Sequence, residues 1–298
     1  MRKQTIVTIL FLLIFTMACS LTELINGNPN PESETNLAAT VSALETQLAE
    51  EPEEPTTEPT VIPTDTPEPT PAPDFEFQNI SFDYHPSLST NVWGEIIPEY
   101  VPGEDEIYAF AEPEHILVHF DNYIIGDHFH TPEIRVFPAA RYRELSDGAA
   151  YNLDLLATVL DQQLREEETY PLLPLVPAAQ ILTAKVDFIQ FDGGRGVRYL
   201  TQLGQALYPA NNQMIFYSFQ GITDDGAYFI SAILPIRHPE LLNNGDDVGN
   251  DWEPYYSEEA WDEYKTQTEA ELDGYPEDSF APSMILLDDI FRSLRISP

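Results

Sequence analysis

Basic side chains are scarce in this sequence of 298 residues, which has 13 Lys and Arg against 51 Asp and Glu. The formal net charge is -38, and a chain this acidic repels polyphosphate instead of releasing its counterions. Nucleic acid is therefore excluded as a partner, and an anionic membrane surface is a poor one. The partners that the charge allows are cations and basic or envelope-associated proteins or polymers.

Cysteine occurs once, at Cys19, so the chain forms no internal disulfide and no thiolate zinc cage. Long apolar runs are missing too. The charge-free stretch from Thr5 to Ala18 is shorter than the roughly 20 residues that a spanning helix needs. Arg2 and Lys3 precede it, and a short apolar run behind a positive start is typical of an export signal.

Cys19 stands directly after a small residue, Ala18, at the end of this apolar run. The sequence Thr16-Met17-Ala18-Cys19 resembles the lipobox of bacterial lipoproteins. The resemblance implies a signal peptide over residues 1–19 and a diacylglyceryl thioether on Cys19, which becomes the mature N-terminus. The alternative is a plain signal peptide cut near Ala18.

A lipid anchor of this kind would decide where the protein acts. At about 0.8 kcal/mol per buried methylene, two or three acyl chains hold a protein at a bilayer essentially permanently. We therefore expect a lipid-anchored protein on the extracytoplasmic face of the cell membrane, with membrane lipid as its partner through acylated Cys19.

Residues 20–74 contain twelve acidic residues and no Lys or Arg, which predicts an acidic, disordered stalk. Leu37, Val41, Leu44 and Leu48 lie at helical spacing and predict a short helix near residues 34–50. Eight prolines follow between residues 51 and 74. Proline and like charges extend this part, so at about 3.1 Å per residue it spans on the order of 70 Å.

Residues 75–298 are predicted to form one α+β domain, and its strands lie where aromatic and β-branched residues cluster between turns. Asp187–Phe191 and Val197–Thr201 flank a glycine-rich turn and predict a β-hairpin. With two more strands at Met214–Gln220 and Tyr228–Leu234, they form a predicted four-stranded antiparallel meander. Earlier strands are predicted at Phe77–Phe82, Ile107–Phe110, Ile116–Phe120 and Ile134–Phe137.

Three helices are predicted to pack on these strands, and strands with packed helices indicate the α+β class. The first carries a leucine stripe, the second is capped by Ser257, and the third opens at Pro282. Their apolar faces consist of Leu153, Leu156, Leu160 and Leu164; of Trp261, Tyr264, Thr268 and Leu272; and of Leu287, Ile290, Phe291 and Leu294.

The two ends of this domain resemble a known family. The opening phrase Asn79-Ile80-Ser81-Phe82-Asp83-Tyr84-His85-Pro86 and the closing phrase Ile290-Phe291-Arg292-Ser293-Leu294-Arg295-Ile296 flank the meander. This arrangement resembles the PsbP-like α/β/α sandwich family. The resemblance implies a non-catalytic accessory or binding module, often exported and attached to a membrane, and it transfers no functional residue.

Histidines at two places are candidate metal ligands. Glu114-His115 and His119 depart from the zinc-protease motif, because the Glu precedes the first His and the run is strand-like. His128 and His130, near Asp121, have the spacing to share one ion on a strand, but a loop with unliganded histidines is favoured.

The acidic span from Asn243 to Asp278 is the other candidate region, and its residues 243–253 offer oxygens suited to calcium. We favour a solvated acidic loop there. Trp252, Tyr255, Tyr256, Trp261 and Tyr264 lie in the same span, where they either pack in a core or contact sugars or a cationic partner. The apolar segment Pro171–Pro177 is interpreted as a cover over the sheet, with a lid over an apolar pocket as the alternative.

These observations predict a non-enzymatic binding or accessory module whose ligand is unknown. No catalytic, cofactor-binding or metal-binding residue is assigned, and the one assigned site is the lipid attachment at Cys19. The alternatives are a hydrolase of envelope polymer and a calcium-dependent adhesion module.

Overall fold

The computed structural model describes residues 73–103, 110–249 and 257–297. The elements of the described residues are, in chain order, β1 (Phe75–Phe77), β2 (Ile80–Phe82), β3 (Asn91–Ile97), β4 (His115–Asp121), β5 (Glu133–Pro138), α3 (Ala139–Leu145), α4 (Asp147–Gln162), β6 (Ala179–Phe191), β7 (Gly194–Gly204), β8 (Phe216–Thr223), β9 (Tyr228–Pro235), the 3₁₀-helix η2 (Gly245–Val248), α5 (Glu258–Gly274), the 3₁₀-helix η4 (Glu277–Ser279), α6 (Met284–Arg292) and β10 (Arg295–Ile296).

Seven strands form one antiparallel sheet in the order β3-β4-β5-β9-β8-β7-β6. The predicted meander is confirmed, because β6, β7, β8 and β9 pair with one another in sequence. Gly193 permits the first reversal, since its φ of 79° lies in the left-handed region that suits glycine. β5 pairs with β9, so β3, β4 and β5 extend the meander on its other side. The predicted α+β class is therefore confirmed.

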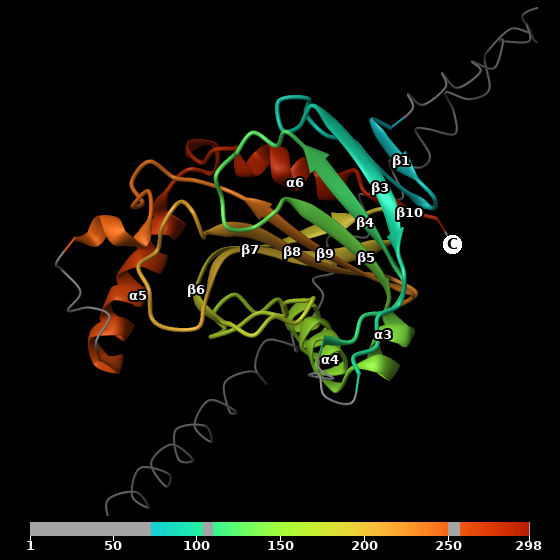
Figure 1. Ribbon diagram of the computed structural model, residues 1–298, viewed down its shortest axis with the longest axis horizontal. Helices are drawn as coiled ribbons and strands as arrows, with labels where there is room; N and C mark the ends of the chain where they lie inside the picture. Colours follow the sequence, from blue (N-terminus) through green and yellow to red (C-terminus); the bar gives the residue numbers. More distant parts are fainter. Residues whose placement is uncertain (1–72, 104–109, 250–256, 298) are drawn as a thin grey trace, which may run out of the picture. The chain divides into compact units, whose positions relative to one another are not determined.

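Helices cover both faces of this sheet (Figure 1). On one face, α3 and α4 pack over Phe137, Tyr199 and Phe229. On the other face, Phe291 of α6 stacks on Phe219 with ring centroids 4.0 Å apart. Because the central strands lie between two layers, nearly every residue of β8 and β9 is buried.

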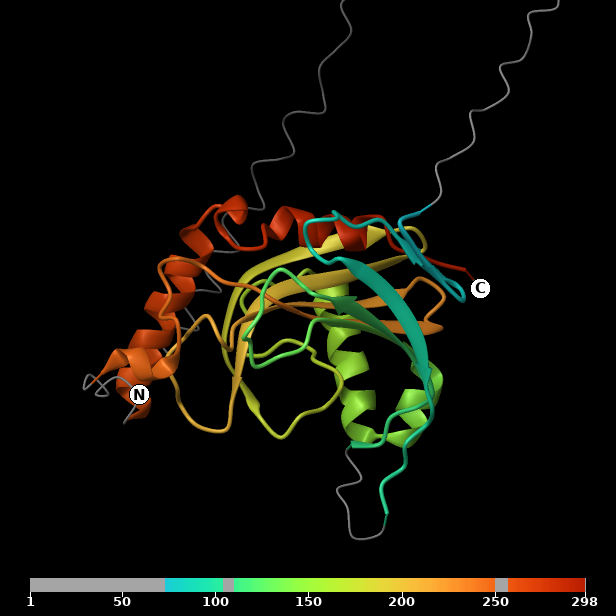
Figure 2. The ribbon, with the colours of Figure 1, turned by 45° about the horizontal axis from the view of Figure 1, so that its top comes forward.

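A second sheet of three strands joins the two ends of the domain, since β2 pairs with β1 on one side and with β10 on the other (Figure 2). The sequence predicted one continuous strand from Phe77 to Phe82. That prediction was wrong, because Gln78 has a φ of 54° and reverses the chain between β1 and β2.

The helix with the leucine stripe is confirmed as α4, with Leu153, Leu156 and Leu160 buried. Ser146 caps it by accepting a hydrogen bond from the Ala149 backbone N–H at 3.2 Å. The helix ends at Gln162, so Leu164 lies beyond it.

The second helix, α5, is capped by Ser257 as predicted, and Trp261, Thr268 and Leu272 are buried on its inner side. The third, α6, begins at Met284 instead of Pro282, because the preceding Ser283 side chain caps the Ile285 N–H. Leu294 follows the end of α6 but is buried with the apolar side chains of that helix.

Two elements were not predicted. β3 contains Gly94 and the charged Glu95 at the sheet edge, and α3 follows β5 directly behind Pro138 without a polar cap. Of the strand predicted at residues 107–110, the first three residues lie outside the described residues, and Phe110 is not in a strand. Cys19 and the predicted stalk helix also lie outside them. None of the helices in the described part of the chain is both long and apolar enough to cross a bilayer.

Candidate functional site

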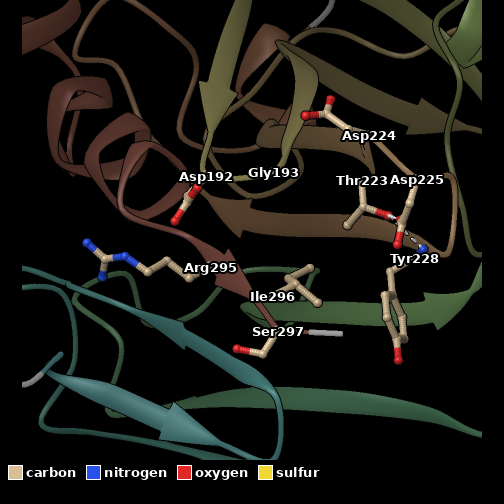
Figure 3. Close-up of a pocket in the computed structure, with 9 residues that line it drawn as sticks. All are labelled: Asp192, Gly193, Thr223, Asp224, Asp225, Tyr228, Arg295, Ile296 and Ser297. Carbon is tan, nitrogen blue, oxygen red and sulfur yellow. Dashed lines mark hydrogen bonds between the residues drawn. The ribbon is translucent and has the colours of Figure 1, made fainter.

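A groove of about 440 Å³ lies at the end of the domain where two hairpin turns meet the last strand (Figure 3). A volume of this size lies in the range of small-molecule sites. The residues that line the groove are Asp192, Gly193, Thr223, Asp224, Asp225, Tyr228, Arg295, Ile296 and Ser297.

The walls of the groove are held in place by backbone contacts between distant segments. The Asp224 N–H donates to the Gly193 carbonyl at 2.8 Å, which joins the β8–β9 turn to the β6–β7 turn. Asp192 forms a parallel bridge with Arg295, and Ser297 N–H donates to the Asn79 carbonyl at 2.8 Å. The groove is therefore assembled from three parts of the chain.

One carboxylate of the groove is committed to the turn that carries it. The Thr223 hydroxyl donates to Asp225 Oδ1 at 2.6 Å, and the Ala227 N–H donates to the same oxygen at 2.9 Å. These hydrogen bonds lower the pKa of Asp225 and keep the carboxylate ionised. Thr223 also accepts from the Tyr228 N–H at 3.0 Å, so both side chains serve the β8–β9 turn.

Three other charged side chains of the groove are free within the described part of the chain. Asp192, Asp224 and Arg295 make no side-chain hydrogen bond or ion pair with described residues. Arg295 is exposed, and in Figure 3 its guanidinium extends away from the other labelled residues. Chemically, the groove offers two carboxylates and one guanidinium to a polar ligand, and no imidazole or thiol lines it.

The first histidine pair does not form a metal site. His115 is buried, and its Nδ1–H donates to the Pro113 carbonyl at 2.8 Å. Burial lowers its pKa, which favours the neutral ring. His119 lies on the same strand with its Nε2 2.8 Å from Glu95 Oε1. The two imidazoles thus have different partners.

The second pair, His128 and His130, is also used by the fold. His128 Nδ1 accepts from the His130 N–H at 3.0 Å, and His128 Nε2–H donates to the Ile215 carbonyl at 2.9 Å. His130 packs edge-on against Phe216, and burial lowers its pKa to about 4. Across the described residues, no group of three or more His, Cys, Asp or Glu side chains is placed to hold a metal ion.

The described portion of the 243–253 loop contains η2, and the side chains of Asn244 and Asp247 cap its start. Asn244 Oδ1 accepts from the Asp246 N–H at 2.9 Å, and Asp247 Oδ2 accepts from the Asn244 N–H at 3.2 Å. This reciprocal pairing is a capping box. Residues 250–253 of the loop, together with Trp252, Tyr255 and Tyr256, lie outside the described residues.

Two further regions singled out in the sequence serve packing. Leu173, in the apolar segment 171–177, is fully buried, and its N–H donates to Gln220 Oε1 at 3.2 Å. The interpretation of this segment as a cover is therefore confirmed. Trp261 is buried, and the Tyr264 hydroxyl accepts from the Ala210 N–H at 2.9 Å, so both side chains hold α5 on the domain.

Sequence reasoning missed a buried network of charges beneath α6. Arg198 is 2% exposed and Asp288 1% exposed, and Arg198 Nε lies 3.4 Å from Asp288 Oδ1. Asp288 also accepts from the Tyr217 hydroxyl at 2.9 Å and from Arg292 Nη2 at 3.0 Å. The signal available was an Arg between Val197 and Tyr199 in β7 and an Asp within the buried stripe of α6.

Comparison with known proteins produced no match, since neither a family model, nor a curated protein, nor a solved structure is similar to this chain. The residues and their contacts therefore carry the functional proposal.

Proposed function

We propose that this protein is a lipid-anchored module that binds a ligand or partner outside the cytoplasm and has no enzymatic activity of its own. The observation that carries the proposal is the position of Cys19. It is the single cysteine of the chain, and it follows Ala18 at the end of a short apolar run that Arg2 and Lys3 precede. Acylation there would anchor the chain at the bilayer.

The composition of residues 20–74 supports the same picture. Eight prolines and like charges favour an extended spacer, which would carry the domain on the order of 70 Å from the bilayer. A module held at that distance is suited to meeting a partner in the envelope.

The groove of Figure 3 supports binding over catalysis. A hydroxyl nucleophile beside a carboxylate would be one arrangement suited to catalysis. In this groove the Thr223 hydroxyl and the Asp225 carboxylate have those positions, but both are engaged in hydrogen bonds of the β8–β9 turn. The free charges of Asp192, Asp224 and Arg295 are instead suited to contacting a polar ligand.

Membership of the PsbP-like α/β/α sandwich family is part of the proposal. Its support is the packing of helices on both faces of an antiparallel sheet. Further support is the pairing of β2, within the opening phrase, with β10, within the closing one. Such a family assignment implies a non-catalytic accessory or binding role.

The anchor is tested with the full chain expressed in a bacterium that processes lipoproteins. We expect the mature protein to begin at Cys19 with a diacylglyceryl mass and to partition into the detergent phase. Cys19→Ser should move the protein to the aqueous phase, whereas the neighbouring control Ser20→Ala should behave like the wild type. An unmodified mature terminus in a soluble pool would overturn the anchor.

The absence of enzymatic activity is tested on the same full chain in detergent micelles. With purified peptidoglycan as the probe, we expect no release of soluble reducing ends above the rate without protein. Release that follows protein concentration would show a hydrolase and refute the non-enzymatic part of the proposal.

A further inference from the structure

Trp93 forms an exposed aromatic surface at the edge of the large sheet. It lies on the edge strand β3, directly opposite His119 of β4. The indole and imidazole rings stack with centroids 4.3 Å apart and 22° between their planes. Trp93 nevertheless stays 40% exposed. One ring face thus rests on His119 while much of the ring meets solvent.

Hydrogen bonds hold this stack in one orientation. The Trp93 Nε1–H donates to Asp121 Oδ1 at 3.0 Å, and Asn91 Nδ2 donates to Asp121 Oδ2 at 3.0 Å. On the other side, His119 Nε2 is 2.8 Å from Glu95 Oε1. Because the indole is already fixed, a ligand that stacks on it loses little affinity to side-chain ordering.

The charges around the ring favour a cation. An aromatic face carries partial negative charge, and the carboxylates of Asp121 and Glu95 stand at the rim of the stack. The hydrogen bonds from Asn91 and Trp93 lower the pKa of Asp121, which keeps that carboxylate ionised in mild acid. An anionic ligand would meet repulsion from these groups and from the net charge of -38.

Besides the His119 imidazole on one face of the ring, no Lys or Arg from the described part of the chain stacks on Trp93. The cation–π contacts among the described residues are Arg165 over Phe188 and Lys185 over Phe280, and neither involves Trp93. The outer side of β3 has no strand partner among the described residues either.

We propose that Trp93, with Asp121 and Glu95 at its rim, binds an arginine or lysine side chain of a basic partner protein. This inference rests on the proposed binding function and names the chemical class of the partner. Arginine fits better than lysine, because its planar guanidinium stacks on an indole while its N–H groups donate to a carboxylate at the ring edge.

The test uses the full chain in detergent micelles and three blocked peptides in which glycine alternates with Arg, Lys or Glu. Affinity is measured by isothermal titration calorimetry at low and high salt. We expect binding of the Arg peptide, weaker binding of the Lys peptide and none of the Glu peptide. Affinity should fall with salt, because the carboxylates at the rim are exposed to solvent.

Two variants and one control locate the binding site. Trp93→Ala should weaken binding of the Arg peptide about 5- to 30-fold. This range is the cation–π contribution of about 1 to 2 kcal/mol converted to a ratio of dissociation constants. Asp121→Asn keeps a hydrogen-bond acceptor for the indole but removes the charge, and it should lower the affinity for the Arg peptide several-fold. Tyr151→Ala removes another aromatic side chain, 65% exposed on α4, and should leave affinity unchanged.

Each contrary result has a distinct meaning. Equal binding by Trp93→Ala and the wild type, or no binding of either basic peptide, would overturn the site while leaving the anchored binding module standing. Tighter, Trp93-dependent binding of the neutral sugar cellohexaose would replace the cationic partner with a glycan. Peptide binding by a chain found unacylated would uphold the site and overturn the anchor instead.

Discussion

The substitution Asp288→Asn tests whether the buried charge network stabilises the packing of α6 on the sheet. The Asp288 carboxylate is 1% exposed and has three partners. It accepts from Tyr217 at 2.9 Å and from Arg292 at 3.0 Å, and it lies 3.4 Å from Nε of the buried Arg198. The variant keeps the shape of the side chain but removes its charge.

The size of the effect follows from the burial of both partners. Removing one member of a buried ion pair costs about 3 to 5 kcal/mol, because the other charge stays buried without compensation. Arg198 keeps an ion pair with Glu277, so we expect the lower end, about 3 kcal/mol. At roughly 2 to 4 °C per kcal/mol for a domain of this size, the melting temperature should fall by about 6 to 12 °C.

The neighbouring residue provides a matched control. Asp289 pairs with the same Arg292 at 2.9 Å, but its side chain is 60% exposed. Asp289→Asn should therefore cost less than about 1 kcal/mol. Urea unfolding of the full chain is followed by tryptophan fluorescence above neutral pH, because burial raises the pKa of Asp288 and a higher pH favours its ionised form. Equal losses in the two variants would refute the reasoning.

Three further predictions concern stability. Burial lowers the pKa of His130 from 6.5 to about 4, so between these values the unfolded chain binds a proton that the native ring does not. Unfolding free energy should thus fall by about 3 kcal/mol as pH drops through this window, and a urea midpoint that falls as steeply in His130→Phe would refute this. In Gly94→Ala the new Cβ would lie 2.6 Å from the Phe77 ring, and we expect calorimetry to show a loss of about 1 to 3 kcal/mol. Ser146→Ala removes the cap on the Ala149 N–H and should cost about 1 kcal/mol in urea, so an unchanged midpoint would show that the cap contributes nothing.

Much of the fold was predictable because local patterns agree with the tertiary packing. The turns around Gly193 and Gly226 carry glycines with positive φ, and the runs between them are apolar enough to mark the strands of the meander. The helix caps at Ser146 and Ser257 lie next to clear apolar stripes. The edge strand β3 was missed because none of its residues is fully buried. Its sequence therefore lacks the alternation of apolar and polar residues by which half-buried strands are recognised.

The candidate sites were much less predictable. The groove of Figure 3 needs Asp192, Asp224 and Arg295, which come from three distant segments, and no catalytic or binding motif marks any of them. Trp93 and His119 are brought together by the pairing of β3 with β4, which the sequence did not indicate. The histidines that did attract attention, His128 and His130, hold backbone and aromatic contacts instead.

By itself, the sequence determined the acidity from which we predict that nucleic acid is not a partner, the presence of one α+β domain rich in antiparallel strands, and the signal on which the proposed anchor at Cys19 depends. Each of these is a property of composition or of neighbouring residues, and such properties can be inferred without knowledge of long-range contacts. The tertiary structure decided which charges are buried, which are free and which aromatic ring stays exposed. Those outcomes depend on strand register and helix packing, which join residues as distant as Arg198 and Asp288.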